Sequence, residues 1–310
     1  MKIKNAISKH SKGYLVPTIT SYWHTIGFAL LYLIVLQVLT GIFLAAFYTP
    51  DASLANSSIQ YLENEVSNGW LIRRCHIIGA SLIFGALYLH FIKALYYKAC
   101  RYKNRLTYWS GLACWYLIMG ISFTGYVLPW GQMSFWGATV ITNLLGIIPL
   151  VGNTLVKFVW GSSVVGNLTL KRFFVFHFIL PAVLLCVIYL HIWLIHTMGN
   201  TPRVPSKAYH ANVRYRRLYP NYIEKDLITV TLVTGLLIYF VCFNPFIFDN
   251  PVNNLPGDAL VTPKHIVPEW YFLPFYLILK LISVKWMGIL AMVGVIAFPA
   301  FLPFFDKDNL

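Results

Sequence analysis

The stretch HIIGASLIFGALYLH, residues 76–90, places a histidine at each end of an otherwise apolar run. The same pattern returns in HFILPAVLLCVIYLH, residues 177–191, again with the histidines 14 residues apart. Fourteen residues are just under four turns of an α-helix, so both histidines of a stretch share one face, about 21 Å apart along the axis. A lone imidazole among leucines usually bonds to a neighbouring helix. A repeated interval indicates two matched binding levels instead.

The composition indicates an integral membrane protein. Hydrophobic residues make up 58% of the 310 residues and charged residues 11%, and the mean hydropathy is +0.65. Six apolar stretches are long enough to cross a bilayer as helices. They lie near residues 25–47, 77–97, 107–127, 173–195, 227–244 and 287–305. The sequence therefore predicts an all-α membrane protein, in which four of the six spans form a bundle and short helices lie at its periphery.

The net charge of +14 fits a membrane topology better than a nucleic-acid surface. When successive loops are assigned to alternate sides, most of the basic residues and both chain ends fall on one side. The positive-inside rule makes this the inner side. The basic segment 1–23 has no cleavage-site pattern, and we expect it to lie on the membrane surface.

The four histidines form two opposed pairs if both spans run from the outer to the inner side. His76 then lies level with His177 near the outer face, and His90 level with His191 near the inner face. Bis-histidine coordination of haem iron takes imidazoles from opposite sides of a flat macrocycle, which two helices of a bundle can supply. The sequence predicts two stacked b-type haems with these histidines as iron ligands. The five cysteines form no CxxCH motif, so covalent haem attachment has no support.

Glycines in the first and third spans repeat the interval. Gly27 and Gly41 are 14 residues apart, and so are Gly111 and Gly125. Glycine is common in membrane helices because it permits close packing, but the matched spacing also predicts room for a porphyrin. We expect Gly41 and Gly125 beside the outer haem, and Gly27 and Gly111 beside the inner one.

Haem propionates are anions and need cations beyond each ring. Arg73 lies three residues before His76 and Lys93 three residues after His90, so each shares a face with its histidine. We expect Arg73 to serve the outer haem and Lys93 the inner haem, whereas Arg74 points elsewhere. The alternative for both is a cation that snorkels to the interface.

The loop VPEWYFLPFY, residues 267–276, places a carboxylate among aromatic rings on the outer side. Pro268 suits the first turn of a short helix. Glu269 is poorly solvated beside Trp270, Tyr271 and Phe272, so its pKa should rise and it could accept a proton near neutral pH.

A second outer segment, GYVLPWGQMSFWGATVITN at 125–143, follows the third span. Pro129 and Gly131 should break that span, and the apolar run after them could form short helices along the interface. This segment would form the wall that faces the loop of Glu269. An apolar slot between them with one buried acid suits a quinol.

Three polar residues lie together at the inner side. His196 follows His191 by five residues, roughly 140° round the helix, so it cannot bind the same iron. Lys225 and Asp226 begin the next span at the same depth. The three residues form a candidate proton-delivery group, although each alone is more often an ordinary helix-end residue.

These motifs, together with RFFVFHFILP, closely resemble cytochrome b of the respiratory bc1 complex (ubiquinol:cytochrome c oxidoreductase) over essentially the whole chain. The resemblance implies a haem-binding bundle at residues 1–200 and a C-terminal region at 201–310. It implies quinol oxidation on the outer side, with one electron passing to a Rieske iron–sulfur protein and the other through both haems to an inner quinone. It also implies an organelle-encoded protein of the mitochondrial inner membrane, with both termini on the matrix side. Its partners would be the Rieske protein, cytochrome c1, other bc1 subunits, lipid and a second complex, and no nucleic acid.

The resemblance also assigns roles to individual residues. His76 and His177 would hold the low-potential haem, and His90 and His191 the high-potential haem. The quinol-oxidation residues would be Pro268, Glu269, Trp270 and Tyr271, with Tyr126, Pro129, Met133 and Gly137 across the pocket. The quinone-reduction residues would be His196, Asn200, Lys225 and Asp226.

Three features depart from the usual family pattern. Lys93 stands where relatives commonly carry arginine, and Asn200 where serine is frequent. Family members usually have eight spans, whereas six are found here. The last pair could belong to another chain, be replaced by other subunits, or belong to a longer product.

Two alternatives remain open from the sequence. Photosynthetic b6-type cytochromes share the four-helix haem bundle, but there the chain usually ends after four spans and the second histidine pair is one residue wider. A transporter could use buried histidines as proton relays without any haem. A reduced-minus-oxidised absorbance spectrum separates the haem protein from the transporter.

Overall fold

The computed structural model describes residues 15–17, 21–101, 104–198, 215–217, 219–220 and 222–305. Within them, six helices are long and apolar enough to cross a membrane, which confirms the predicted all-α membrane architecture. The six are α2 (Ile26–Phe47), α4 (Gly69–Tyr96), α5 (Arg105–Val127), α8 (Asn167–Met198), α10 (Ile223–Phe243) and α12 (Lys285–Phe301).

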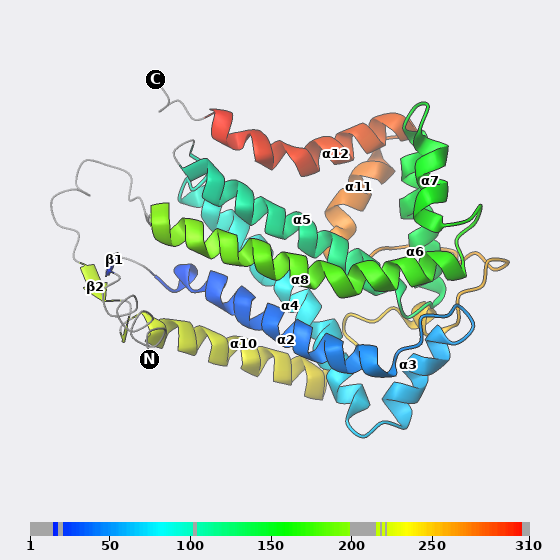
Figure 1. Ribbon diagram of the computed structural model, residues 1–310, viewed down its shortest axis with the longest axis horizontal. Helices are drawn as coiled ribbons and strands as arrows, with labels where there is room; N and C mark the ends of the chain where they lie inside the picture. Colours follow the sequence, from blue (N-terminus) through cyan, green and yellow to red (C-terminus); the bar gives the residue numbers. More distant parts are fainter. Residues whose placement is uncertain are drawn as a thin grey trace.

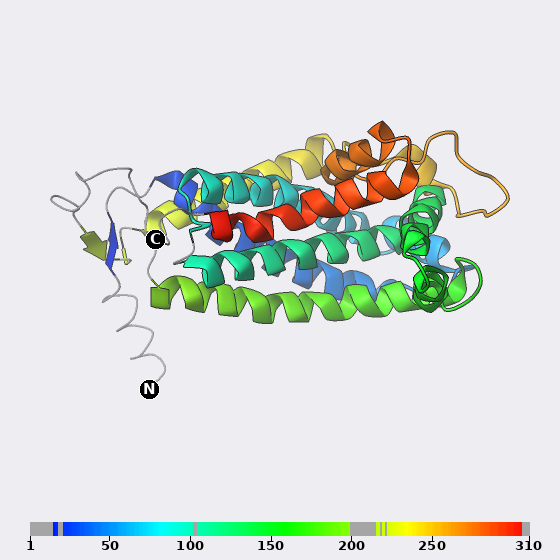
Figure 2. The same ribbon diagram turned by 90° about the horizontal axis from the view of Figure 1, so that it is seen from above.

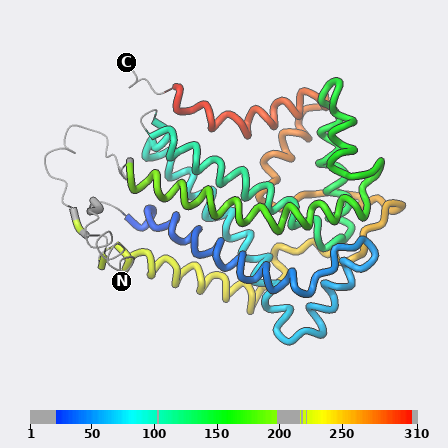
Figure 3. Tube along the Cα trace, viewed as in Figure 1, coloured from blue at the N-terminus to red at the C-terminus, as the bar shows by residue number. Residues whose placement is uncertain are grey.

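The long helices run side by side as a bundle (Figure 1 and Figure 2). Helix α2 packs along α4, and α5 along α8, so the two histidine-bearing helices belong to different pairs. Helix α10 packs on α2 and α4, whereas α12 contacts α5. The chain trace shows α10 and α12 on opposite flanks of the bundle (Figure 3).

An apolar layer fills the bundle halfway between the two histidine levels. It takes one buried side chain from each of the four central helices, and each lies seven residues from the histidines or glycines of its own helix. The layer consists of Ile34, Ile83, Ile118 and Leu184. Burial of such aliphatic side chains and their dense packing fix the helices around the layer.

Short helices gather at one end of the bundle, on the right in Figure 1. They are α3 (Ala55–Asn64), α6 (Gln132–Asn143), η3 (Leu144–Ile147), α7 (Gly152–Trp160), η4 (Pro251–Asn254), η5 (Trp270–Phe272) and α11 (Leu273–Leu281). A second buried cluster joins this end, with Ala55, Val127, Phe135, Val156 and Leu170 among its members. The predicted peripheral helices after the third span are thereby confirmed.

The remaining elements are η1 (Tyr22–His24), η6 (Leu302–Phe305) and two strands. β1 (Leu15–Pro17) pairs antiparallel with β2 (Tyr215–Arg217). This pair was not predicted, because three-residue strands leave no periodic signal. The rest of the basic segment expected on the membrane surface, up to residue 20, lies outside the described residues.

Several helix boundaries differ from the prediction, and α8 begins at Asn167 and α10 at Ile223 rather than near residues 173 and 227. Helix α4 begins at Gly69 rather than near residue 77, so Arg73 and Arg74 are helical residues. The helix can extend beyond its apolar stretch because both arginines find carboxylate partners. The helix expected to start at Pro268 starts instead at Trp270, and Pro274 occupies the first turn of α11.

Candidate functional site

His76 on α4 and His177 on α8 face each other across the bundle, and we call this pair the outer level. Their ring centroids lie 6.3 Å apart, with the ring planes at 79°. A metal–nitrogen bond is about 2 Å long, and each nitrogen lies roughly 1 Å from the centre of its ring. The ring centres of two imidazoles that bind one iron from opposite sides would therefore lie about 6 Å apart. The outer level therefore has the spacing that two histidines on one iron require.

Both rings of the outer level lie against glycines of the neighbouring helices. A Cβ at Gly41 would lie 3.2 Å from Cε1 of His76. A Cβ at Gly125 would lie only 2.4 Å from Cε1 of His177. The structure thus brings each predicted glycine to the histidine of its own level, where a larger side chain would displace the ring.

Hydrogen bonds fix which ring nitrogen of the outer histidines is free. The Thr40 hydroxyl donates to the Leu36 carbonyl at 2.8 Å, so the 2.9 Å contact from Thr40 Oγ1 to His76 requires Nδ1–H to donate. His177 Nδ1 donates to the Ile121 carbonyl at 2.8 Å. Both rings therefore keep an unprotonated Nε2, the nitrogen available to a metal.

His90 and His191 form the inner level with the same glycine contacts. A Cβ at Gly27 would lie 3.2 Å from Cε1 of His90, and one at Gly111 3.1 Å from Cε1 of His191. The two levels are thus built alike, as the repeated interval of 14 residues predicts.

The inner histidines differ in how they are oriented. His191 Nδ1 donates to Ser110 Oγ at 2.8 Å, because the Ser110 hydroxyl already donates to the Thr107 carbonyl. His90 Nδ1 is buried with no hydrogen-bond partner among the described residues. The residue before its glycine, Gly27, is Ile26, whereas a threonine or serine precedes each of the other three glycines: Thr40, Ser110 and Thr124.

A cation lies near each level. Arg73 is close enough to His76 for their charges to interact, and it forms a 2.5 Å ion pair with Glu63. Lys93 interacts in the same way with both inner histidines. The placement of one cation at each level is therefore as expected, and the contacts to propionates stay predictions.

Comparisons with known proteins show the family. Residues 11–199 match the family model described as cytochrome b/b6/petB, and residues 256–310 the one described as cytochrome b(C-terminal)/b6/petD. The chain belongs to the cytochrome b family. Membership implies that the chain binds b-type haem. The residues present fit that group, because the outer histidines face each other with Nε2 free and a glycine lies against each ring.

Relatives of this cytochrome b come from fungi and bacteria. The chain is 41% identical over 292 residues to cytochrome b of Candida albicans, covering 94% of this chain and 75% of that one. It is 41% identical over 296 residues to cytochrome b/c1 of Bradyrhizobium diazoefficiens, covering 95% of this chain but only 43% of that longer protein. A solved hyperthermophilic respiratory complex III contains a chain with a TM-score of 0.91 and 28% identity, matched over 98% of this chain and 81% of that one. These likenesses favour the respiratory type over the b6 and transporter alternatives.

Glu269 of the cytochrome b chain lies at the start of η5. Its backbone carbonyl accepts the N–H of Phe272 at 2.8 Å, and its side chain is half-buried. Burial raises the pKa of the Glu269 carboxyl from its usual value to about 7, and the nearby Asp249 carboxylate adds to the rise. The predicted direction of the pKa shift is confirmed.

Aromatic residues of η5 dock on the helix that carries His76 and His90. The Tyr271 ring stacks on Phe84, with the centroids 3.8 Å apart and the planes at 1°. The Tyr88 hydroxyl donates to the Tyr271 carbonyl at 2.5 Å, and Trp270 Nε1 donates to Ser81 Oγ at 3.3 Å. Burial raises the pKa of Tyr271 well above its usual value. These contacts fix the backbone beside Glu269 relative to α4.

Helix α6 is joined to the loop that precedes η5. The Gln132 side chain donates to the Val261 carbonyl at 3.1 Å and accepts the Asp258 N–H at 3.1 Å. Just before α6, a Cβ at Gly131 would lie 1.9 Å from the carbonyl oxygen of Asn253, so only glycine fits there. The segment expected to form the facing wall is thus held against the loop that leads to Glu269.

The residues expected in the facing wall lie at the end of α5 and on α6. Tyr126, at the end of α5, lies near enough to Glu269 and Tyr271 for their charges to interact. Met133 on α6 is buried, and Gly137 has open space where a Cβ would stand. The group of Tyr126, Tyr271 and Glu269 is therefore assembled, whereas the roles of Met133 and Gly137 stay predictions.

Three of the four predicted inner quinone residues lie where α8 ends and α10 begins, at the same end of the bundle (Figure 1). His196 belongs to the last turn of α8. Lys225 places Nζ 5.8 Å from the Tyr22 ring centroid. Asp226 is 7% exposed, and its Oδ1 has no hydrogen-bond partner among the described residues. Asn200 lies outside the described residues.

Several residues of the site were not predicted. Thr40 and Ser110 orient histidines, and their position directly before the glycines could have indicated this. His24 lies near both Lys93 and Lys225, and its place at the start of the first span was the available signal.

Proposed function

We propose that the chain is the di-haem cytochrome b subunit of a respiratory bc1 complex. It would form the catalytic core of ubiquinol:cytochrome c oxidoreductase, oxidising ubiquinol at the outer site and reducing quinone at the inner site with proton translocation. The observation that carries the proposal is the pair of histidine levels in one bundle, with a Glu269 site at the outer end. The likeness to a solved respiratory complex III supports it.

The four histidines hold the cofactors in this proposal. The outer level would bind the low-potential haem and the inner level the high-potential haem, each through Nε2. When bound, the haems would supply an electron path across the membrane. Arg73 and Lys93 would neutralise the propionates, and the four glycines would leave room for the rings.

Glu269 accepts a proton from ubiquinol in the outer site. Its raised pKa suits this task, because a base near the working pH is largely free to take a proton yet can release it again. Tyr271 and Tyr126 contribute hydroxyl groups close to the same carboxylate. The pocket walls would be Pro268, Trp270, Phe272, Pro129, Met133 and Gly137.

Reduction of quinone at the inner site requires protons from the inner aqueous side. His196, Lys225 and Asp226 lie at that end of the bundle and would deliver them, with Asn200 as a further contact. The unpartnered Oδ1 of Asp226 supports a role in proton binding.

The assembly follows from the proposed activity. The chain would work with a Rieske iron–sulfur protein, cytochrome c1 and other bc1 subunits, in a dimer of complexes embedded in lipid. Residues 1–200 would form the haem domain and 201–310 the second region. The location would be the mitochondrial inner membrane with matrix-side termini. The bacterial relatives make a bacterial respiratory membrane the alternative.

A spectrum and an activity assay test the proposal together. The purified complex should show two b-type bands in a reduced-minus-oxidised spectrum, and ubiquinol should reduce cytochrome c. A complex with one b band, or with two bands and no quinol oxidation, would contradict it.

A further inference from the structure

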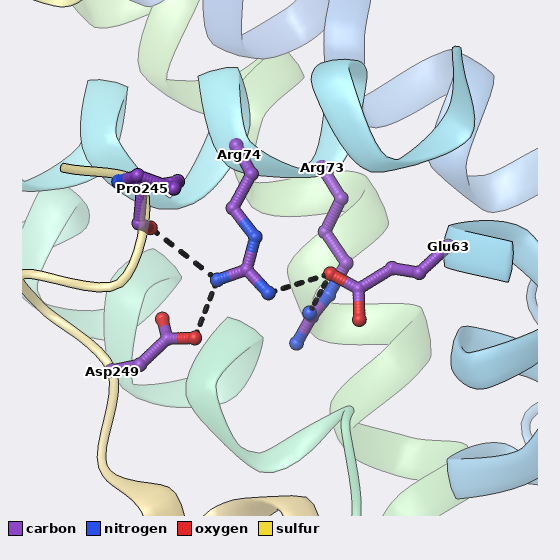
Figure 4. Close-up of polar contacts among 5 residues, drawn as sticks. All are labelled: Glu63, Arg73, Arg74, Pro245 and Asp249. Carbon is purple, nitrogen blue, oxygen red and sulfur yellow. Dashed lines mark hydrogen bonds and ion pairs between the residues drawn. The ribbon is translucent and has the colours of Figure 1, made fainter. Parts of the chain in front are cut away.

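Two adjacent arginines of α4 meet one carboxylate from α3 (Figure 4). Oε1 of Glu63 lies 2.5 Å from Arg73 and 2.8 Å from Arg74. Arg74 also pairs with Asp249 in the loop after α10, and donates to the Pro245 carbonyl at 3.4 Å. Arg74 therefore joins α3, α4 and that loop.

Arg74 is buried in this position. Its side chain is 6% exposed, compared with 15% for Asp249 and 22% for Glu63. Its guanidinium lies 4.4 Å from the Phe246 ring centroid. A planar fork can reach two carboxylates and an aromatic face at once, which a lysine ammonium cannot do. Loss of Arg74 would remove the cation that Glu63 and Asp249 share, although Glu63 would keep its ion pair with Arg73.

Asp249 is tied to the segment of Glu269 by an aromatic contact. Phe248 and Trp270 are the direct neighbours of these two acids in sequence, and their ring centroids lie 6.5 Å apart. The two carboxylates are close enough for the charge of Asp249 to act on Glu269. The pair formed by Arg74 and Asp249 is thus linked to the segment of the proposed proton acceptor.

We propose that Arg74 is a positioning residue for quinol oxidation, which holds Asp249 beside Glu269 and thereby sets how readily Glu269 takes a proton. The inference deepens the proposed function and rests on it. Arg74 was expected to point away from the site, and it reaches the site through its carboxylate partner rather than through the substrate.

The charges around Glu269 determine in which direction each substitution should move its pKa. The titratable groups that interact electrostatically with Glu269 are Asp249, Tyr126 and Tyr271. Lys264 and His265 precede Glu269 in its own segment. Asp249 is paired with Arg74, which is in turn paired with Glu63. Removal of the Arg74 cation leaves Asp249 uncompensated and disfavours ionised Glu269. Removal of the Asp249 anion does the opposite.

The experiment compares Arg74→Gln with Asp249→Asn in the complete, haem-loaded complex. The infrared carboxyl band of Glu269, identified by its loss in Glu269→Gln, is titrated from about pH 5 to about pH 9. We expect the midpoint to rise by roughly one pH unit in Arg74→Gln and to fall by a similar amount in Asp249→Asn. Arg74→Lys keeps the charge and should stay nearer the parent protein.

Opposite shifts support the inference, because a merely structural role would not move the two midpoints in opposite directions. Shifts of the same sign, or no shift, overturn it. Asp249→Asn is the milder change and keeps the test decisive if Arg74→Gln fails to assemble, as judged from its haem bands. If the infrared midpoints shift in opposite directions but the pH profile of quinol oxidation does not change, Arg74 and Asp249 still set the proton affinity of Glu269, whereas the proposed role of Glu269 in quinol oxidation fails and takes the role of Arg74 in that reaction with it.

Discussion

The ring of His177 rests directly on the backbone of Gly125, so that a Cβ on this glycine would come within 2.4 Å of Cε1. Real side chains do not approach so closely, and any larger residue must displace the ring or separate α5 from α8. The geometry of the outer level therefore depends on a missing side chain as much as on the two histidines.

Gly125→Ala should disturb the outer haem alone. The added methyl group overpacks the ring contact, at a cost of about 1–3 kcal/mol, and we expect a shifted or weakened low-potential b band with the inner band unchanged. Gly120→Ala is the matched control on the same helix, because no atom lies within 4 Å of its Cβ position. Equal effects of the two variants on both bands would contradict the assignment.

Replacement of the α8 histidines should remove one haem at a time. His177→Leu removes a ligand of the outer level and His191→Leu a ligand of the inner level, so each variant should lose one of two b bands. Absorbance spectra of the purified complexes measure this, and the surviving band shows that the complex has assembled. Two intact bands in His177→Leu would refute the ligand assignment.

Thr40→Val should weaken the outer site without removing a ligand. The Nδ1–H of His76 would lose its acceptor, and loss of such a partner typically lowers metal affinity by about 10–100-fold. Haem retention during dilution, followed by absorbance, measures the effect. Thr40→Ser keeps a hydroxyl and should behave like the parent protein, and identical retention in the valine variant would show that the hydrogen bond is irrelevant.

The pH dependence of quinol oxidation should follow Glu269. Only the ionised carboxylate can accept a proton, and its pKa is raised to about 7. The rate should therefore increase with pH up to about 7 and level off above it. Stopped-flow reduction of the haems by quinol measures the rate.

Glu269→Gln tests the same carboxylate. Glutamine keeps the shape but cannot accept the proton, so the rate should fall and lose its rise near pH 7, while haem content stays unchanged. Reduction of the inner haem through the inner quinone site should persist. An unaltered pH profile would reduce Glu269 to a structural residue.

The histidine and glycine positions were predictable because a helix has a fixed rise and turn. Equal intervals on four helices can only be satisfied by two levels, and the contacts of Gly41 and Gly111 with their histidines confirm this. The ion pair between Arg74 and Asp249 was not predictable, since it joins residues far apart in the sequence. The helix was expected at Pro268, whereas η5 begins at Trp270 and the proline of the first α-helical turn is Pro274 of α11.

The apolar layer formed by Ile34, Ile83, Ile118 and Leu184 places four aliphatic side chains between the two histidine levels. These side chains carry no hydroxyl, amide or carboxyl group that could order a file of water molecules. These four side chains therefore offer a hydrogen ion no hydrogen-bonding group, whereas an electron could tunnel between haems at the two levels of the proposed function. If the chain has the proposed function, we expect this layer to oppose the return of protons between the two histidine levels.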